Sequence, residues 1–196
     1  MDFRKTLTIT LLFVTVQLGF SQDISSFFTK ADAFFNAYVS DGRVKYKEIK
    51  SNPARLEELM DMAQSIKVST SDAKNYQAFW INTYNLSVIK GIVDNYPIKS
   101  PLDKGGFFDK ITYDVGGKRI ALNDIENKLL RGNFPKEARF HFVLVCAGLG
   151  CPPIIPSAYL PNTLEAQLQR QTELSLNNPD FVKVKGKKIL LSQIFE

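Results

Sequence analysis

The chain has 196 residues, 44% of them hydrophobic and 23% charged, which is the balance of a soluble globular protein long enough for a sizeable core. The formal net charge of +5 is modest, and the charges are interspersed. Because no basic stripe with interleaved aromatic residues is present, nucleic acid is not an expected partner.

The N-terminal residues have the pattern of a targeting segment. Arg4 and Lys5 precede an apolar run that ends in a small-x-small sequence, as in a secretory signal peptide. We therefore expect residues 1–21 to be a signal peptide and residues 22–196 to form one domain, exported to the periplasm or secreted. The apolar run is short for a membrane span, so no stable span is expected once the signal is removed; an uncleaved anchor is the alternative.

Helical patterns dominate the first half of the domain. Apolar residues recur at helical spacing from Ser25 to Val39, and Asn52-Pro53 opens a second helix. The longest helical pattern runs from Asp72 to Asn95, where Asp72 can cap the first turn and Pro97 prevents continuation. Because apolar groups surround nearly all of this helix, we expect it to be buried at the centre of the fold.

Two polar residues of this long helix, Asn82 and Asn85, fall on one stripe of its surface. Buried amides need hydrogen-bond partners. The two side chains either tie down neighbouring loops or face a binding site, and the sequence leaves both interpretations open.

Strands are predicted mainly in the second half, with two further helices between them. The expected elements are a short strand within Arg43–Ile49, a hairpin over Ile111–Leu122 around Gly116-Gly117, a helix from Asn123 to Leu130, a buried strand over Arg139–Val145, a helix after Pro161-Asn162, and a hairpin over Phe181–Leu191 around Gly186. The predicted fold class is α+β, with several helices, including the long buried one, packed on a mostly antiparallel sheet. Because the chain stops in mid-pattern, we expect the domain to be truncated at its C-terminus.

The candidate site follows the predicted buried strand. It holds the only histidine, His141, and both cysteines, Cys146 and Cys151. A glycine-containing loop follows Cys146, and the backbone N–H groups around Gly148 can form an anion nest or oxyanion hole beside a thiolate. His141 is the only histidine available as a base. Residues five apart point to opposite faces of a regular strand, so a dyad needs a bulge or turn before Cys146.

Two charged residues complete the candidate site. Glu126 can orient His141, or it can cap its own helix, because Asn123-x-x-Glu126 resembles a capping box. Arg131 can bind an anionic substrate or complement the helix dipole. Both residues therefore keep a structural and a functional interpretation.

The cysteine pair has interpretations of its own. With four residues between them, Cys146 and Cys151 can form a disulfide across the loop, which would shape the loop or act in redox chemistry. Zinc binding by the cysteines with His141 has little support, because no standard ligand spacing is met. No metal and no cofactor is therefore expected.

Together these motifs resemble one family, the domain of unknown function 547. The matching blocks are Ala78-Phe79-Trp80-Ile81-Asn82-Thr83-Tyr84-Asn85, Gly116-Gly117, Leu122-Asn123-Asp124-Ile125-Glu126, Leu130-Arg131, His141-Phe142, Val145-Cys146, Cys151-Pro152-Pro153 and Leu191-Ser192-Gln193-Ile194-Phe195. The resemblance spans roughly Arg43 to the end of the chain, and the motif set is specific. It implies polar signature positions at Asn82, Asn85, Glu126, Arg131, His141 and Cys146. Some relatives carry serine at the position of Cys151, which implies that Cys146 is the singular thiol, and the family carries no settled activity over to this chain.

Three functions are compatible with this site. The first is an exported thiol-dependent hydrolase or acyl transferase, with Cys146 as nucleophile, His141 as base and Glu126 as orienting carboxylate. In that hypothesis the substrate is bound by Arg131, Asn82, Asn85 and Gly148. The second is a non-catalytic envelope module that binds an unknown small molecule or peptide. The third is a redox role of the two cysteines, and the sequence does not decide whether the protein is an enzyme.

Overall fold

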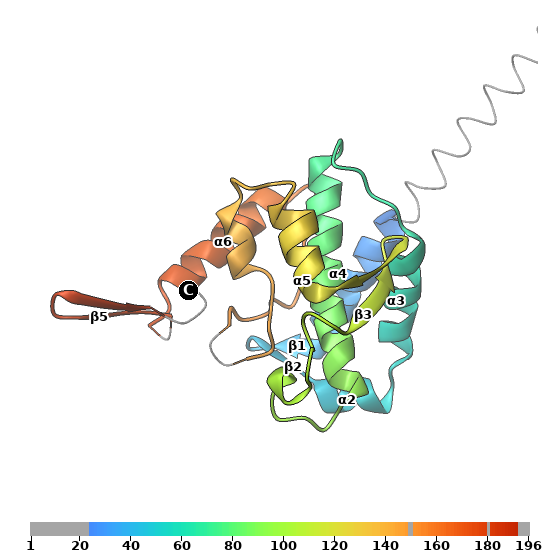
Figure 1. Ribbon diagram of the computed structural model, residues 1–196, viewed down its shortest axis with the longest axis horizontal. Coiled ribbons are helices and arrows are strands. Elements are labelled where there is room, and N and C mark those ends of the chain that lie inside the picture. Colours follow the sequence, from blue (N-terminus) through green and yellow to red (C-terminus); the bar gives the residue numbers. More distant parts are fainter. Residues whose placement is uncertain (1–23, 149–150, 180, 192–196) are drawn as a thin grey trace, which may run out of the picture.

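Helices make up most of the structured chain (Figure 1). The computed structural model describes residues 24–148, 151–179 and 181–191. The predicted signal peptide over residues 1–21 and the C-terminal end of the chain lie outside these described residues. In the described part, no helix has the length and apolar character needed to cross a membrane.

The helical elements are distributed along the whole described chain. They are residues 24–38, α2 (Tyr46–Ser51), α3 (Ala54–Ser65), α4 (Ala73–Asp94), η1 (Pro101–Asp103), α5 (Leu122–Asp124), the π-helical segment η2 (Ile125–Arg131), η3 (Ala138–Phe142) and α6 (Leu164–Leu176). Three hairpins accompany them: β1 (Val39–Ser40) with β2 (Arg43–Val44), β3 (Thr112–Val115) with β4 (Lys118–Ala121), and β5 (Val182–Lys185) with β6 (Lys188–Leu191).

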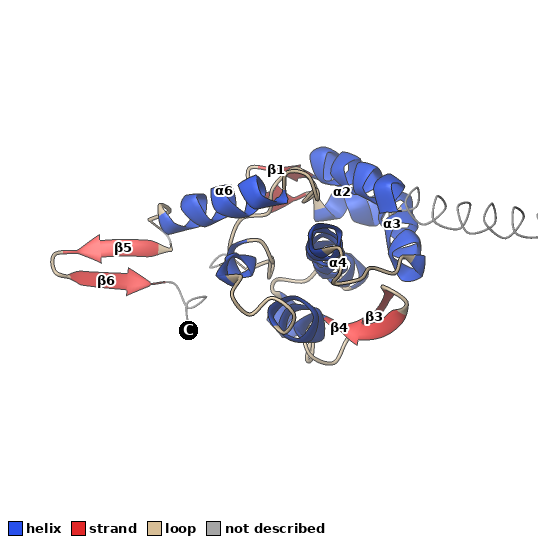
Figure 2. Ribbon diagram, turned by 90° about the horizontal axis from the view of Figure 1, so that it is seen from above, coloured by secondary structure: helices blue, strands red, loops and turns tan. Residues whose placement is uncertain are grey.

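The long helix α4 is the centre of the fold, as predicted. Its N-cap is Asp72, whose side chain accepts a hydrogen bond from the backbone N–H of Asn75. Nearly every residue from Tyr76 to Val93 is buried. Viewed along its axis, α4 has α2 and α3 on one side and the β3–β4 hairpin on another (Figure 2). A helix with no solvated face must be enclosed in this way, because each of its faces carries apolar groups.

The β3–β4 hairpin confirms the prediction from the paired glycines. Gly116 and Gly117 have φ values of +63° and +71°, which a two-residue type I′ turn requires at both central positions. Gly116 also packs directly on α4, because a Cβ atom there would lie 2.2 Å from Cη2 of Trp80. The turn therefore needs glycine for its conformation and, at Gly116, for its packing.

The predicted α+β class is correct only in a coarse sense. The strands form three separate two-stranded antiparallel sheets, so the continuous sheet expected beneath the helices does not exist among the described residues. The short strand expected over Arg43–Ile49 is limited to Arg43–Val44, and a helix begins two residues later. The fold is better described as mostly helical with three small hairpins.

The predicted buried strand over Arg139–Val145 was wrong. Residues Ala138–Phe142 form a 3-10 helix, which begins where the Glu137 side chain accepts a hydrogen bond from the backbone N–H of Arg139. The apolar run that suggested a strand is buried as expected. Its backbone groups at Val143 and Val145 are satisfied by a side chain of α4, so no neighbouring strand is needed.

Candidate functional site

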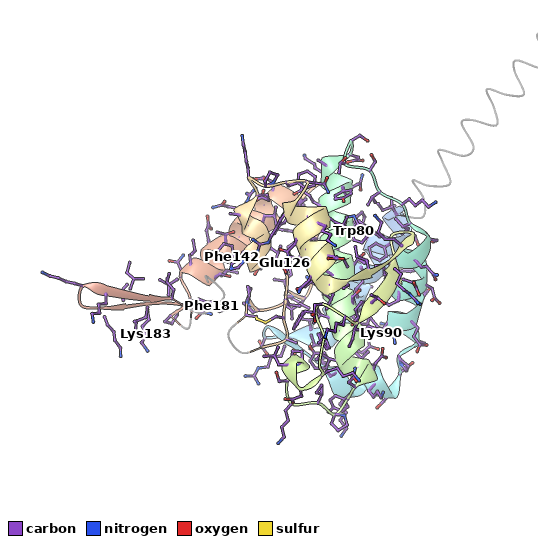
Figure 3. All side chains as sticks on the ribbon, in the orientation of Figure 1. Trp80, Lys90, Glu126, Phe142, Phe181 and Lys183 are labelled. Atoms are coloured by element: carbon purple, nitrogen blue, oxygen red, sulfur yellow. A yellow bond between two sulfur atoms is a disulfide. The ribbon has the colours of Figure 1, made fainter. Side chains whose placement is uncertain are left out.

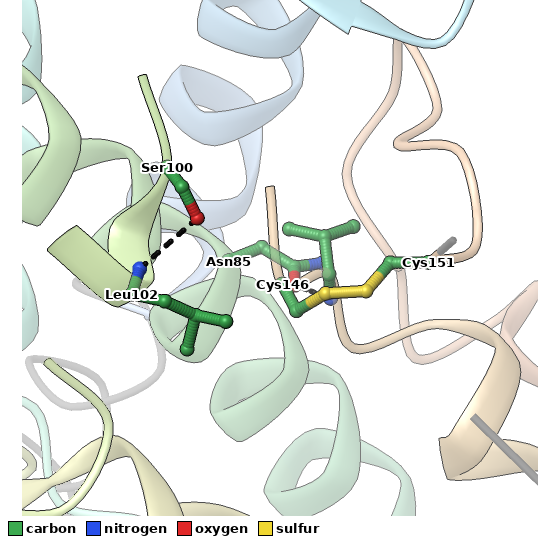
Figure 4. The surroundings of a disulfide bond; sticks show 6 residues. Asn85, Ser100, Leu102, Cys146 and Cys151 are labelled. Atoms are coloured by element: carbon green, nitrogen blue, oxygen red, sulfur yellow. Dashed lines mark hydrogen bonds between the residues drawn. A yellow bond between two sulfur atoms is a disulfide. The ribbon is translucent and has the colours of Figure 1, made fainter. Parts of the chain in front are cut away.

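Cys146 and Cys151 form a disulfide, with Cα atoms 5.9 Å apart (Figure 4). The loop they close turns sharply at Ala147, where φ is +54°, and the backbone N–H of Cys151 donates to the Gly148 carbonyl at 3.1 Å. The disulfide interpretation of the cysteine pair is therefore confirmed. In this state neither sulfur is a thiolate, so neither can act as a nucleophile or as a zinc ligand.

Asn85 fixes the segment that leads into the disulfide. Its Nδ2 donates to the Val143 carbonyl at 3.0 Å, and its Oδ1 accepts from the Val145 backbone N–H at 3.0 Å. The side chain is buried and lies beside Cys146 (Figure 4). A single side-chain amide thus makes the two hydrogen bonds to this segment that the backbone of a neighbouring β-strand would otherwise make.

Asn82 does the same one turn earlier in α4. Its Nδ2 donates to the Tyr159 carbonyl at 2.7 Å, and its Oδ1 accepts from the Tyr159 backbone N–H at 2.9 Å. Asn82 is fully buried. Both asparagines therefore hold the chain on either side of the cysteine loop, in agreement with the first interpretation of their stripe. Their polar atoms are occupied by backbone partners.

Glu126, Arg131 and His141 form a connected polar cluster, in which Glu126 lies on the helix that follows the β3–β4 hairpin (Figure 3). Nε of Arg131 donates to Oε1 of Glu126 at 3.1 Å, and Nη2 lies 2.9 Å from the same oxygen. The same Nη2 lies 2.9 Å from Nδ1 of His141. Arg131 therefore lies between the carboxylate and the imidazole, so Glu126 contacts His141 through Arg131 and does not orient it directly, as the sequence had suggested.

The π-helical segment explains why Glu126 and Arg131 meet. Residues five apart in a regular α-helix are about 140° apart around the axis, from its 3.6-residue period. In a π-helix the backbone repeat is i to i+5, so Glu126 and Arg131 lie on the same face. Single-turn π-helices occur frequently at functional sites, and here the segment creates the polar cluster.

The capping-box interpretation of Glu126 was wrong. The helix begins at Leu122, one residue before the expected cap Asn123, and no side chain caps its first turn. Glu126 pairs with Arg131 instead. Arg131 likewise does more than complement the helix dipole, because it binds two side chains at once.

The surroundings of the cluster favour the neutral form of His141. A guanidinium can only donate, so Nδ1 of His141 accepts and the imidazole proton lies on Nε2. Partial burial lowers the pKa of His141 below its ordinary value, the nearby Arg131 cation lowers it further, and Glu126 opposes both effects. Burial and the negative charge of Glu126 also raise the pKa of the neighbouring Tyr84, against the effect of Arg131.

A cavity of about 780 Å³ lies beside the disulfide, and we call it the disulfide cavity. It is lined by Asp41, Gly42, Arg43, Val44, Tyr46, Lys99, Ser100, Val145, Ala147, Gly148, Cys151, Pro152, Pro153, Ile154, Asn178 and Phe181. Glu126, Arg131 and His141 are not among these residues. The predicted site is therefore divided: Gly148 and Cys151 face this cavity, whereas the polar cluster lies outside its lining.

Sequence reasoning missed the cations of the disulfide cavity. Arg43 follows the β1–β2 turn and Lys99 precedes η1, so they come from segments far apart in the chain. Neither forms an ion pair with another residue in the described ranges. Only the fold brings them together, and no spacing in the sequence points to either one.

The chain thus forms a mostly helical domain with a loop closed by a disulfide, the polar cluster of Glu126, Arg131 and His141, and the disulfide cavity. Within the described ranges, no group of three or more histidine, cysteine, aspartate or glutamate side chains is arranged to hold a metal ion. The chain belongs to the family described as "Protein of unknown function, DUF547", whose sequence profile matches residues 68–176. That range includes α4, the polar cluster and both cysteines. No protein with a curated description and no solved structure matches the chain.

Proposed function

We propose that this protein is an exported binding module, and that its disulfide cavity takes a small anionic ligand with an apolar body. The observation that carries this proposal is the presence of two cations, Arg43 and Lys99, on an otherwise largely apolar lining. Neither cation forms an ion pair with another described residue. Ligand sites commonly combine apolar walls with a few polar groups that orient the ligand.

The charge of the disulfide cavity favours an anion. Among the described residues, its lining carries two cations and one carboxylate, Asp41, an excess of one positive charge. Both cationic side chains belong to exposed residues, so their charges are hydrated in the free protein. A ligand carboxylate or sulfonate between them would gain charge-assisted hydrogen bonds without the cost of breaking an existing ion pair.

The side chains that line the disulfide cavity favour a ligand with an apolar body. Val44, Tyr46, Ile154 and Phe181 lie around the same space, with Pro152 and Pro153 beside the disulfide. Burial raises the pKa of Tyr46 to about 12, so this phenol stays neutral and adds no charge of its own.

The lining is held in place before any ligand arrives. The disulfide closes one wall, and Asn85 fixes the Val143–Val145 segment behind it. Gly42 packs against Pro153 so closely that a Cβ atom at position 42 would lie 2.7 Å from the proline ring. A preformed site lowers the entropic cost of binding, because few of its groups need to be ordered.

Export is part of the same proposal. The signal-like residues 1–21 support it, and a disulfide between Cys146 and Cys151 is the state expected in an oxidising compartment. The periplasm and the extracellular medium both fit.

A fluorescence titration tests the binding proposal, with anilinonaphthalene sulfonate as probe and dodecanoate as competitor. Arg43→Met and Lys99→Met keep the apolar stems and remove the charges, and together they should weaken both ligands at least tenfold. Lys47→Met with Lys50→Met, two exposed lysines of α2, is the matched control and should leave binding unchanged. Equal competition by dodecylamine, or unchanged binding to the cavity variant, would reject the proposal.

A thiol-dependent hydrolase has weaker support. It needs a free thiolate at Cys146 and a base at His141, but the sulfur is in a disulfide and Nδ1 of the imidazole is occupied by Arg131. The lowered pKa of His141 also makes it a weaker proton acceptor than an ordinary imidazole. Turnover by the reduced protein that is abolished by Cys146→Ser would restore this hypothesis.

A redox role is the second candidate, favoured by the position of Cys151 on the cavity lining. A thiolate of a dithiol substrate would attack Sγ of Cys151, and Cys146 would leave as a thiolate. The second substrate thiol would then release oxidised substrate and two reduced cysteines. Rapid, reversible exchange with glutathione, followed by mass spectrometry, would support this role, whereas a disulfide that resists millimolar reduced glutathione would exclude it.

A further inference from the structure

Among the residues that the structure describes, the large exposed apolar side chains are concentrated in one projecting segment. Large apolar residues are exposed at seven described positions, and six of the seven fall within residues 174–191. These six are Leu174, Leu176, Val184, Ile189, Leu190 and Leu191. The segment comprises the end of α6 and the β5–β6 hairpin, which extends away from the rest of the molecule (Figure 1; Figure 2). Such a concentration of exposed apolar groups marks an interaction surface.

The register of the hairpin gives it two unlike faces. Val182 pairs with Leu191, and Val184 pairs with Ile189, so these four aliphatic side chains share one face. The other face carries Lys183 opposite Leu190, followed by the pair Lys185 and Lys188. We call the first the aliphatic face and the second the lysine face.

The hairpin is strongly basic. Lys183, Lys185, Lys187 and Lys188 lie between Phe181 and Leu191, a range without any acidic residue. Lys183 projects from the hairpin and Phe181 lies at its base (Figure 3). Phe181 is buried, and its backbone N–H donates to the Asn178 carbonyl at 3.0 Å, so the base is anchored while the hairpin from Lys183 to Leu191 is exposed.

The two strands are also an incomplete sheet. Among the described residues, neither β5 nor β6 has a second neighbouring strand, so each strand has an edge without a paired strand. At the start of β5 the Val182 backbone N–H donates to the Asn178 carbonyl at 3.0 Å, which leaves β6 as the freer edge. A two-stranded hairpin alone is marginally stable in water, and a third strand or a packing partner normally completes it. Exposed strand edges are templates for such an addition.

We propose that the β5–β6 hairpin is a docking site for an extended segment of a partner protein in which acidic and apolar side chains alternate. Added as a third strand, such a segment would direct its apolar side chains to the aliphatic face and its carboxylates to the lysine face. Main-chain hydrogen bonds to the free edge would supply affinity, and the alternation would supply specificity.

The arrangement of the aliphatic and lysine faces argues against a lipid bilayer or a second copy of the chain as the partner of the hairpin. A lipid bilayer would take up the aliphatic face, but the lysines point to the opposite side, away from the headgroups that they would need to reach. A second copy of the hairpin carries the same four positive charges, so edge-to-edge pairing would bring like charges together.

Fluorescence anisotropy on the full chain tests the proposal. The probe is a labelled peptide of four Glu-Val repeats, and its controls are a block peptide of the same composition and a version with N-methylated valines. Val184 and Ile189 are 69% and 65% exposed, so replacing both by serine leaves the core intact. That variant, and separately Lys183→Glu with Lys185→Glu, should bind the alternating peptide at least tenfold more weakly. Lys47→Glu with Lys50→Glu is the charge-matched control and should retain binding.

Several outcomes would overturn the proposal. Equal binding of the block or N-methylated peptide would show a non-specific charge effect without strand addition. Hairpin-dependent binding to phosphatidylglycerol vesicles without peptide binding would identify a membrane surface. A dimer in sedimentation velocity that is lost in the Val184/Ile189 variant would identify a second copy as the occupant.

Discussion

Arg131 donates a hydrogen bond from Nη2 to Nδ1 of His141 across 2.9 Å, and the direction of this bond determines the state of the imidazole. Because the guanidinium has no acceptor, the ring can accept only while Nδ1 is unprotonated. Protonation would break the bond and place two cations in contact. The structure therefore assigns His141 a structural role as a neutral acceptor, with Arg131 held in position by Glu126.

The first prediction concerns the pKa of His141, which is the only histidine in the chain. An NMR titration of its Hε1 resonance should give a pKa below the ordinary 6.5, because burial and Arg131 both favour the neutral ring. Arg131→Gln should raise this pKa and Glu126→Gln should lower it further. Shifts of the same sign in both variants would contradict the Glu126–Arg131–His141 arrangement.

The second prediction follows by linkage. The pKa of His141 is lower in the folded protein than the value near 6.5 expected for the unfolded chain, so the unfolded state binds more protons as the pH falls. The histidine contribution to stability is therefore complete above pH 6.5 and is lost on acidification. Urea unfolding of the wild type should show stability falling as the pH is lowered from 7 towards 5. The same measurement on His141→Gln should give a flatter dependence, and equal slopes would refute the linkage.

The third prediction concerns the two hydrogen bonds that the Asn85 side chain makes to the Val143–Val145 segment. Asn85→Leu keeps a similar volume but leaves the Val143 carbonyl and the Val145 N–H without partners in a buried segment. The expected loss of unfolding free energy is about 2–6 kcal/mol, from about 1–3 kcal/mol for each of the two orphaned groups. Asn162→Leu, at an exposed position, is the control and should change stability little. A loss as small as that of the control would mean that the segment holds itself in place.

Local signals predicted much of this fold. The periodic apolar pattern of α4, its cap at Asp72 and the paired glycines of the β3–β4 turn each encode a structure within a few residues. The structure of the segment Ala138–Val145 could not be predicted from such local signals. Its apolar run looks like a strand, but the partner that satisfies its backbone is Asn85, more than 50 positions earlier in the chain.

The sequence indicates which residues belong to the candidate site but not how they contact one another. Glu126, Arg131 and His141 are candidates from sequence alone, but the order of their contacts depends on a π-helical segment that α-helical spacing does not suggest. The disulfide was one of several open alternatives, and the fold selected it. The cations Arg43 and Lys99 gave no signal, because isolated exposed charges look alike until the chain folds.

The fourth prediction concerns the Cys146–Cys151 disulfide. Its cysteines are only five positions apart, so chain-entropy arguments limit its contribution to about 2 kcal/mol. Reduction should therefore lower the urea midpoint modestly and leave the protein folded. The Cys146→Ser/Cys151→Ser variant should match the reduced wild type and should be insensitive to reductant. Global unfolding on reduction would show that the loop carries far more of the fold than its contacts indicate.

The fifth prediction compares two glycines with nearly the same backbone conformation. Gly116 has φ +63° and Gly186 has φ +59°, but a Cβ atom would meet Trp80 at position 116 and nothing within 4 Å at position 186. Gly186→Ala should cost only the backbone strain, about 1–2 kcal/mol. Gly116→Ala should cost that amount plus about 1–3 kcal/mol for displacing the indole from its packed position. Thermal unfolding monitored by tryptophan fluorescence reports both effects, since Trp80 is the only tryptophan. Equal losses in the two variants would show that the β3–β4 turn does not press on α4.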